Sequence, residues 1–209
     1  MRVSFIGMSN IGKSFWAKRM VAERGFTRID CDALIERKLA PELAPGGHRG
    51  LRGIAKWLGF PSEATYEGRR QLYQRQEQVV VVEAIERLDE DKTTPFVIDT
   101  TGSVIYIGSD ILADLRRKTC IVYFEGSETH ITDLFKRYIS TPKPVIWDTY
   151  FVPQGNETLK ETLKRCYPDL LEARAKKYRE LAHITIPYSL HHDRTFDIGA
   201  FLEKESARR

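Results

Sequence analysis

The chain has 209 residues, 42% of them hydrophobic and 30% charged, which is the usual composition of one compact globular domain. Lys and Arg outnumber Asp and Glu by only 33 to 29, an excess too small and too dispersed to indicate a nucleic-acid-binding protein. The three cysteines are far apart, and no apolar run is long enough for a signal peptide or a membrane span. We therefore expect a cytoplasmic protein in a reducing compartment, with neither nucleic acid nor membrane as a partner.

Short apolar strands alternate with helices along the whole sequence. Strands are expected at residues 3–6, 26–30, 96–98, 120–124 and 184–186. Helices are expected at 13–24, 33–39, 54–58, 63–88, 111–118, 128–138, 159–182 and 197–206, the seventh with an interruption near Pro168. Residues 41–53 and 140–156 contain prolines and glycines, so we expect a loop in the first segment and a mobile loop with exposed aromatic side chains in the second.

This alternation predicts an α/β fold, with a five-stranded parallel sheet between two layers of helices. No internal repeat and no linker divides the sequence, so residues 1–209 are expected to form a single domain. A chain of this length also has room for an inserted loop or lid.

The segment GMSNIGKS at residues 7–14 matches the pattern G-x-x-x-x-G-K-[ST] at every fixed position. Glycines allow the backbone to curl so that several N–H groups point at one phosphate, and the following helix adds its N-terminal dipole. Lys13 is suited to reach the β- and γ-phosphates of a nucleotide, and the Ser14 hydroxyl to ligate Mg²⁺. A chance match in a chain of this length is expected on the order of once in a hundred. The candidate nucleotide-binding residues of this segment are Gly7, Asn10, Ile11, Gly12, Lys13, Ser14 and Phe15.

Three aspartates follow predicted strands. Asp99 ends the apolar run 96–98, a position from which a carboxylate can hold Mg²⁺ or its water, although it can equally cap the next turn. Asp30 and Asp32 close the second predicted strand, and alternation puts both carboxylates on one side of the chain. One is suited to hold a metal-bound water and the other to accept the proton of a substrate hydroxyl. The alternative is that the pair caps the helix that begins at Ala33.

These features resemble the shikimate kinase family, one of the groups of small P-loop kinases, and the similarity covers most of the chain. It begins with the first strand, the GMSNIGKS motif and the helix after it, and continues with D-x-D-x-x-I-E at 30–36 and I-A-x-x-L at 54–58. Further along, PKP at 142–144 resembles the tip of the family's lid, with lysine where arginine is usual. The segment LEARAKKY at 171–178 is similar to the family's late helix.

The resemblance implies ATP and Mg²⁺ as cofactors and phosphorylation of a ring hydroxyl, with shikimate as the nearest named substrate. It also implies that Asp32 orients or deprotonates the hydroxyl while Asp30 supports Mg²⁺. Arg137 matches an arginine near the adenine, Lys143 lies at the lid tip, and Arg174 matches the arginine that grips the substrate carboxylate. The expected subregions are a nucleotide core at 1–30 and 90–138, a substrate-binding helical part at 31–89 and a lid at 139–158.

The sequence departs from the family around the substrate. The family's glycine triplet after the third strand is TTG at 100–102 here, so that only Gly102 remains. The family's arginine three residues before a glutamate is also missing, because Gln74 precedes the best-matching Glu77. An insertion around 60–67 shifts this region. The residues left as candidates for the missing charge are Arg75, Arg70 and Arg69, and Arg75 enters the candidate site.

Smaller features leave alternatives open. The pair His191 and His192 lacks a third ligand at a suitable spacing, so we interpret it as part of a solvated loop rather than a metal site. Trp147, Tyr150 and Phe151 in the expected lid are suited either to stack on a base or substrate or to pack a closed lid.

The sequence therefore favours an ATP-dependent small-molecule kinase that acts as a monomer on shikimate or another small hydroxy acid. A non-catalytic nucleotide-binding regulator or sensor is one alternative, favoured by the lost glycines and the missing arginine. A kinase for a different small acid, a polyol or a nucleoside monophosphate is another. The candidate catalytic residues are Lys13 and Asp32. The candidate substrate-binding residues are Asp32, Gly102, Arg174 and Arg75, and the candidate metal ligands are Ser14, Asp30 and Asp99.

Overall fold

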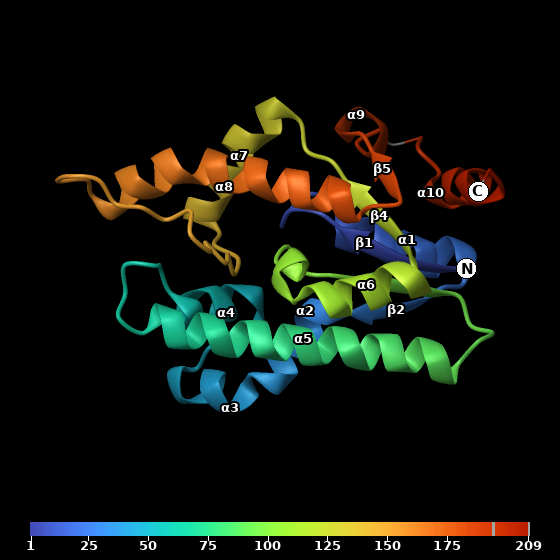
Figure 1. Cartoon of the computed structure of the whole chain (residues 1–209), viewed down its shortest axis with the longest axis horizontal. Helices are drawn as coiled ribbons and strands as arrows, with labels where there is room; N and C mark the ends of the chain where they lie inside the picture. Colours follow the sequence, from blue (N-terminus) through green and yellow to red (C-terminus); the bar gives the residue numbers. More distant parts are fainter. Residues whose placement is uncertain (194, 209) are drawn as a thin grey trace.

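Five parallel strands form a single sheet in the computed structural model (Figure 1), which describes residues 1–193 and 195–208 and all of their side chains except those of 128–132. The strands are β1 (Arg2–Ile6), β2 (Thr27–Asp30), β3 (Phe96–Asp99), β4 (Cys120–Phe124) and β5 (Ile184–Ile186). Their order across the sheet is β2-β3-β1-β4-β5, and the register places Asp30 beside Asp99. The expected five-stranded parallel sheet is confirmed.

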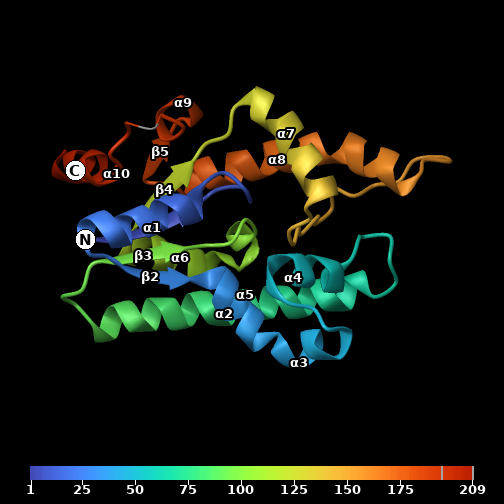
Figure 2. The same cartoon turned by 180° about the vertical axis from the view of Figure 1, so that it is seen from behind.

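Helices cover both faces of this sheet, as the two opposite views in Figures 1 and 2 show. The α-helices are α1 (Lys13–Arg24), α2 (Cys31–Lys38), α3 (Ala40–Leu43), α4 (Gly50–Leu58), α5 (Tyr66–Glu90), α6 (Ser109–Lys118), α7 (Glu128–Ser140), α8 (Leu159–Leu181), α9 (Tyr188–His191) and α10 (Ile198–Ala207). Two short 3-10 helices are η1 (Ala44–Gly46) and η2 (Val104–Tyr106). Helices α1 and α10 pack together on one face, while α2, α5, α6 and α8 contribute to the core on the other. None of the described helices has the length and apolar character needed to cross a membrane.

Alternate side chains of each strand enter two separate cores. In β4, Val122 and Phe124 pack in the core that contains Trp16 of α1, whereas Ile121 and Tyr123 pack in the core shared with α5 and α8. Because both faces of the sheet are covered, the strands are short runs of apolar residues rather than alternating ones. This is why the five strands are recognisable in the sequence.

Two expectations about irregular segments are wrong. Residues 41–53, expected to be a loop, contain part of α3, all of η1 and the start of α4. Pro41 lies in the first turn of α3, where its missing N–H has no helical hydrogen bond to lose. Helix α8 also continues through Pro168 without a break, because the buried neighbours Tyr167 and Leu171 hold both sides of the proline against the core.

The lid segment (residues 139–158) is docked rather than projecting into solvent with its aromatic side chains exposed. Trp147 is only 1% exposed, and its Nε1 donates a hydrogen bond to the hydroxyl of Tyr138 over 3.1 Å. The Tyr66 hydroxyl on α5 donates to the carbonyl of Val145 and accepts from the backbone N–H of Trp147, at 3.2 and 3.1 Å. Trp147 was suited either to stack on a base or substrate or to pack a closed lid, and the structure shows it packed inside the lid.

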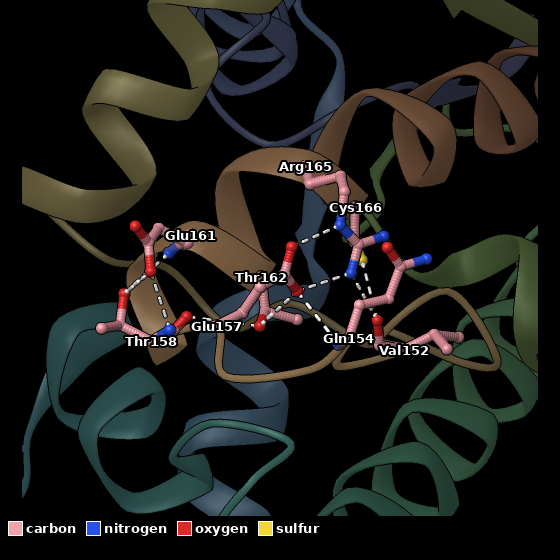
Figure 3. A network of polar contacts seen from close by, with 8 residues as sticks. All are labelled: Val152, Gln154, Glu157, Thr158, Glu161, Thr162, Arg165 and Cys166. Atoms are coloured by element: carbon pink, nitrogen blue, oxygen red, sulfur yellow. Dashed lines mark hydrogen bonds and ion pairs between the residues drawn. The ribbon is translucent and has the colours of Figure 1, made fainter.

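The second half of the lid segment is anchored to the beginning of α8 (Figure 3). Arg165 pairs with Glu157 over 2.7 Å and donates to the carbonyl of Val152 over 2.6 Å. Thr158 and Glu161 form a reciprocal capping box that starts the helix. Both ends of the lid segment are therefore fixed by specific contacts, the first half to α5 and the second half to α8.

The Trp147→Ala variant is expected to be less stable by about 3–5 kcal/mol, because it removes a fully buried aromatic side chain and leaves a cavity. Urea unfolding of the variant and of wild type measures this difference in the free energy of unfolding. Val152→Ala in the same segment is the control, since that side chain is 54% exposed and little buried area is lost. A Trp147→Ala change no larger than that of the control would show that the lid segment is not docked in solution.

Candidate functional site

The segment between β1 and α1 has the backbone conformation of a phosphate-binding loop. Gly7, Asn10 and Gly12 have φ angles of 138°, 67° and 111°, in the left-handed region that allows a backbone to curl around an anion. A side chain at Gly7 is excluded as well, because a Cβ there would lie 2.8 Å from the carbonyl oxygen of Phe124. Helix α1 then begins at Lys13 with no acidic residue in its first turn, so its positive dipole end is left for a ligand.

Lys13 lies inside this loop and is only 6% exposed. Its Nζ donates to the carbonyl oxygens of Gly7 and Met8 at 2.8 and 3.0 Å. Burial lowers the pKa of Lys13 to about 8, and the negative charges of Asp99 and Asp32 partly oppose this shift. A buried ammonium group that has only carbonyl partners is stabilised further by an anion, so the arrangement favours phosphate binding.

The carboxylates at the ends of β2 and β3 share one cation. Arg28 donates to Oδ2 of Asp99, and its Nη2 lies 2.8 Å from Oδ2 of Asp30. The other oxygen of Asp30 accepts from the backbone N–H of Ala33 over 3.1 Å, so Asp30 caps α2, as the alternative interpretation of the sequence has it. The buried Oδ1 of Asp99 has no hydrogen-bond partner among the described residues. Asp99 is therefore the carboxylate that has coordination capacity left.

A Mg²⁺ ion fits this donor set only if phosphate oxygens complete it. No group of three or more His, Cys, Asp or Glu side chains among the described residues is arranged to hold a metal. Mg²⁺ in phosphate-transfer sites is usually bound by one or two protein groups together with waters and phosphates, which matches the free oxygen of Asp99 and the exposed Ser14. Asp30 fits less well, because both of its oxygens are engaged.

Asp32 is the second residue of α2 and lies in its first turn, with its side chain half-buried. Burial raises its pKa to about 6, Lys13 opposes the shift, and Asp99 and Asp30 add to it. The charge of Lys143, from the lid segment, acts on both Asp32 and Lys13. The structure therefore brings the two candidate catalytic residues and the lid lysine into one electrostatic cluster.

Glu77 of α5 is a buried carboxylate, and it contacts the TTG segment at 100–102, where the shikimate kinase family has three glycines. Its Oε1 accepts hydrogen bonds from the hydroxyls of Thr101 and Ser103, the latter over 2.9 Å. Burial raises the pKa of Glu77 to about 7, although these hydrogen bonds oppose the shift. Its Oε2 is buried and has no hydrogen-bond partner among the described residues. Thr101, which stands where the family has glycine, thus holds a carboxylate that is also influenced by Asp32.

Arg174 is buried and joins two parts of the molecule. Its Nη1 donates to the carbonyl of Gly102 over 3.2 Å, and its Nη2 donates to the carbonyl of Ile146 in the lid segment over 2.5 Å. Its guanidinium also lies over the ring of Tyr106, 5.4 Å from the ring centre. Two of the donors that a carboxylate clamp would use are therefore already engaged by backbone carbonyls.

Of the three arginines left open on α5, Arg70 contacts Gln74, the residue that stands at the expected position. Arg70 donates to the side-chain oxygen of Gln74, one turn along the helix, and pairs with Glu67. Arg75 is exposed, and two residues along a helix turn its side chain about 200° away from Glu77. The structure does not bring Arg75 to the carboxylate cluster.

A cavity of about 500 Å³ lies beside the phosphate-binding loop and includes residues that sequence reasoning missed. Its lining contains Phe15 and Arg137, both expected, together with Tyr188 and His192. The rings of Tyr188 and His192 stack with centres 3.9 Å apart, and the buried His191 makes a 2.8 Å hydrogen bond with the carbonyl of Glu125. The interpretation of the histidine pair as a solvated loop is wrong for His191, which is buried at the end of α9, whereas His192 is exposed at the edge of this cavity.

Gly102 lies against the phosphate-binding loop, since a Cβ there would be 2.8 Å from Oγ of Ser9. The Gly102→Ala variant is expected to displace Ser9 and to weaken nucleotide binding by about tenfold, the equivalent of a strain of about 1–3 kcal/mol. Isothermal titration with an ATP analogue measures this affinity. Gly68→Ala is the matched control, because a Cβ at that position meets nothing within 4 Å. Equal affinities of the two variants would contradict the close approach.

Comparison with known proteins gives a match in structure but none in sequence. No family model matches the chain, and no curated protein is similar to it at significant level. Shikimate kinase from Acinetobacter baumannii in complex with shikimate matches 99% of this chain and 90% of its own, with a TM-score of 0.59 and 18% identity. Shikimate kinase from Bacteroides thetaiotaomicron matches 100% of this chain and 95% of its own, with a TM-score of 0.54 and 20% identity.

A kinase with a different name is nearly as similar. Dephospho-CoA kinase from Campylobacter jejuni matches 100% of this chain and 95% of its own, with a TM-score of 0.51 and 14% identity. The chain has the fold of the small P-loop kinases. The resemblance expected from the motifs is thus confirmed at the level of the fold, whereas a fold shared by differently named kinases does not choose an acceptor.

Proposed function

We propose that this small P-loop protein is an ATP-dependent kinase that transfers the γ-phosphoryl group to a hydroxyl of a small molecule. The observation that carries the proposal is Lys13 inside the curled loop, where the negative charges of Asp99 and Asp32 both act on it. A loop that binds phosphate needs the lysine, but it does not need a half-buried carboxylate whose pKa is raised toward neutrality. Such a carboxylate is suited to accept a proton from an attacking hydroxyl.

Each group then has a distinct task. The loop backbone and Lys13 bind the β- and γ-phosphates, and Lys143 adds positive charge from the lid segment. Ser14 and Asp99 would hold Mg²⁺, which when bound neutralises phosphate charge. Asp32 orients the acceptor hydroxyl and takes its proton as the oxygen attacks. The docked lid segment excludes water, which limits hydrolysis of ATP in place of transfer.

The nucleotide base is proposed to occupy the cavity beside the loop. Its lining includes Phe15, Arg137 and the stacked rings of Tyr188 and His192, so planar groups are available to contact a planar base. On this proposal residues 1–30 and 90–138 form the nucleotide core, which Tyr188 and His192 complete, and the acceptor lies against the helical part at 31–89. The protein is further proposed to act as a monomer in the cytoplasm.

An acceptor panel tests the function. ADP release is measured with ATP and Mg²⁺, alone and with shikimate, other small hydroxy acids, polyols and nucleoside monophosphates. Release that depends on one acceptor supports the kinase and identifies its substrate class. A second candidate, a nucleotide-binding regulator, is favoured by one observation, the engagement of Arg174 by two carbonyls. Tight ATP binding with no acceptor-dependent release across the panel would select the regulator.

The activity is expected to have a bell-shaped pH profile with limbs near pH 6 and pH 8. The pKa of Asp32 is raised to about 6, so its basic form is lost as the pH falls through that value. The pKa of Lys13 is lowered to about 8, so its positive charge is lost as the pH rises through that value. The profile of kcat/KM reports the free enzyme and is the quantity to measure. A flat profile from pH 5 to pH 9 would contradict both roles.

A further inference from the structure

A second cavity, of about 580 Å³, lies between α4 and the beginning of the lid segment. Its side chains are His48, Arg49, Arg52 and Lys56 from the α4 region, opposite Ser140 and Pro142. No acidic residue lines it among the residues that the structure describes. A hollow that has positive charge on one wall and none of the opposite sign favours an anionic occupant.

The three cations share one face of α4. Arg49 is the residue at which α4 is capped, and Arg52 and Lys56 follow at intervals of three and four, which is the spacing of neighbours on a helix surface. All three side chains are exposed, and none has an ion pair or side-chain hydrogen bond within the described part of the chain. Their charges are therefore available to a ligand instead of being neutralised inside the protein.

The positive potential of this face comes from its side chains and not from the helix dipole. Although α4 has no acidic residue in its own first turn, the Glu36 carboxylate accepts a hydrogen bond from the N–H of Gly50 and so compensates the N-terminus of the helix. The buried Gly53 allows the preceding loop to lie directly on the helix, because a Cβ at that position would be 2.8 Å from the carbonyl carbon of His48. This packing keeps His48 and Arg49 beside the other two cations.

The lid segment connects the cationic cavity with the candidate transfer site. A smaller hollow of about 220 Å³ shares Lys56 with the cavity, and Lys143 and Glu63 also line it. The charge of Lys143 acts on both Lys13 and Asp32. The lid segment therefore contributes both to the lining of the cationic cavity and to the charges around the reacting groups.

We propose that the cavity between α4 and the lid segment is an anion site that binds a phosphate group carried by the acceptor. The acceptor is then a hydroxyl compound that already bears a phosphate, and its recognition depends on Arg49, Arg52 and Lys56 rather than on the engaged Arg174. The inference rests on the proposed kinase function only in naming the ligand as an acceptor. The anion site itself stands on the cavity and its charges.

Pyrophosphate is the probe for the site. The phosphate-binding loop is first filled with Mg²⁺ and a non-hydrolysable ATP analogue, and pyrophosphate binding is then measured by isothermal titration. Wild type is compared with a variant that carries Arg49→Gln, Arg52→Gln and Lys56→Gln. The matched control carries Lys18→Gln, Arg37→Gln and Lys204→Gln, three exposed and unpaired cations on other helices, so that the net charge changes equally. Thermal unfolding checks that both variants fold.

The expected result is binding to wild type and control, and affinity weaker by about tenfold or more in the α4 variant. No binding to the nucleotide-loaded wild type, or equal loss in both variants, would overturn the anion site. Inorganic phosphate and glycerol 3-phosphate are titrated in parallel. If inorganic phosphate binds as tightly as glycerol 3-phosphate, the assignment of the site to a phosphate ester is overturned.

Measurement of phosphoryl transfer to paired acceptors distinguishes the anion site from the proposed kinase activity. Hydroxyl compounds are tested as matched pairs with and without a phosphate group, and the α4 variant is expected to lose activity only toward the phosphorylated member. Phosphorylation of the unphosphorylated members alone would overturn the substrate class. Pyrophosphate binding that depends on α4, in a protein that phosphorylates nothing, would contradict the kinase and support the anion site.

Discussion

The Lys13→Ala variant is expected to lose phosphoryl transfer by on the order of 10²–10³-fold or more in kcat, while it keeps its fold. Lys13 is the positive group inside the curled loop. Its charge stabilises the negative charge on the γ-phosphate oxygens during transfer. Its removal costs the folded protein little, because burial already disfavours the ammonium form and lowers its pKa to about 8. Initial rates with saturating ATP and acceptor measure the loss.

The exposed Lys18 on the same helix provides the control for this variant. Lys18→Ala removes the same charge from α1 without touching the loop, and its rate is expected to stay within about twofold of wild type. Lys13→Met keeps most of the side-chain volume but not the charge, and should be as inactive as Lys13→Ala. A Lys13→Met variant with near-normal turnover would refute the role of the charge.

The Asp32→Asn variant is expected to lower kcat by about 10²–10⁴-fold while nucleotide affinity stays nearly unchanged. The amide keeps the shape and polarity of the carboxylate but cannot accept a proton. Since the charge of Asp32 helps to keep Lys13 protonated, the alkaline limb of the pH profile is also expected to move to lower pH in this variant. Rapid-quench measurement of a single turnover separates the transfer step from product release.

Asp169→Asn on α8 is the matched control for this substitution, because that aspartate is exposed and far along the chain from the cluster. Its rate and pH profile should equal those of wild type. Full activity of Asp32→Asn would show that the acceptor hydroxyl needs no base in this protein. Loss of ATP affinity together with activity would instead mean that Asp32 acts through the loop.

The strands and the phosphate-binding loop could be predicted from the sequence because local signals specify them. A strand covered on both faces is a short apolar run, and the curl at residues 7–14 requires glycine at Gly7 and Gly12. Both are decided within a few residues of chain. The long helix α5 was predictable despite its four consecutive valines, because the charged residues on either side of them favour a helix.

The acceptor side could be predicted only in part, because contacts between distant segments determine it. Trp147 of the lid segment donates hydrogen bonds to the hydroxyls of Tyr66 and Tyr138, and Arg174 donates to the carbonyls of Gly102 and Ile146; no local pattern reveals these contacts. The stacked pair beside the loop depends on where α9 returns to the core. Proline was misleading at Pro168 for the same reason, since packing against the core keeps α8 continuous there, whereas Pro41 occupies a first-turn position that a helix tolerates.

The most direct test of the central claim is to follow the label of ATP that is radioactive at the γ-phosphate. Wild type and Lys13→Ala are incubated with Mg²⁺, labelled ATP and the acceptor panel, and the products are separated into organic phosphate and inorganic phosphate. With wild type, label is expected in an organic phosphate for at least one hydroxyl compound, and with Lys13→Ala in none. Label that remains in ATP, or appears only as inorganic phosphate, with every acceptor would contradict the proposed kinase activity.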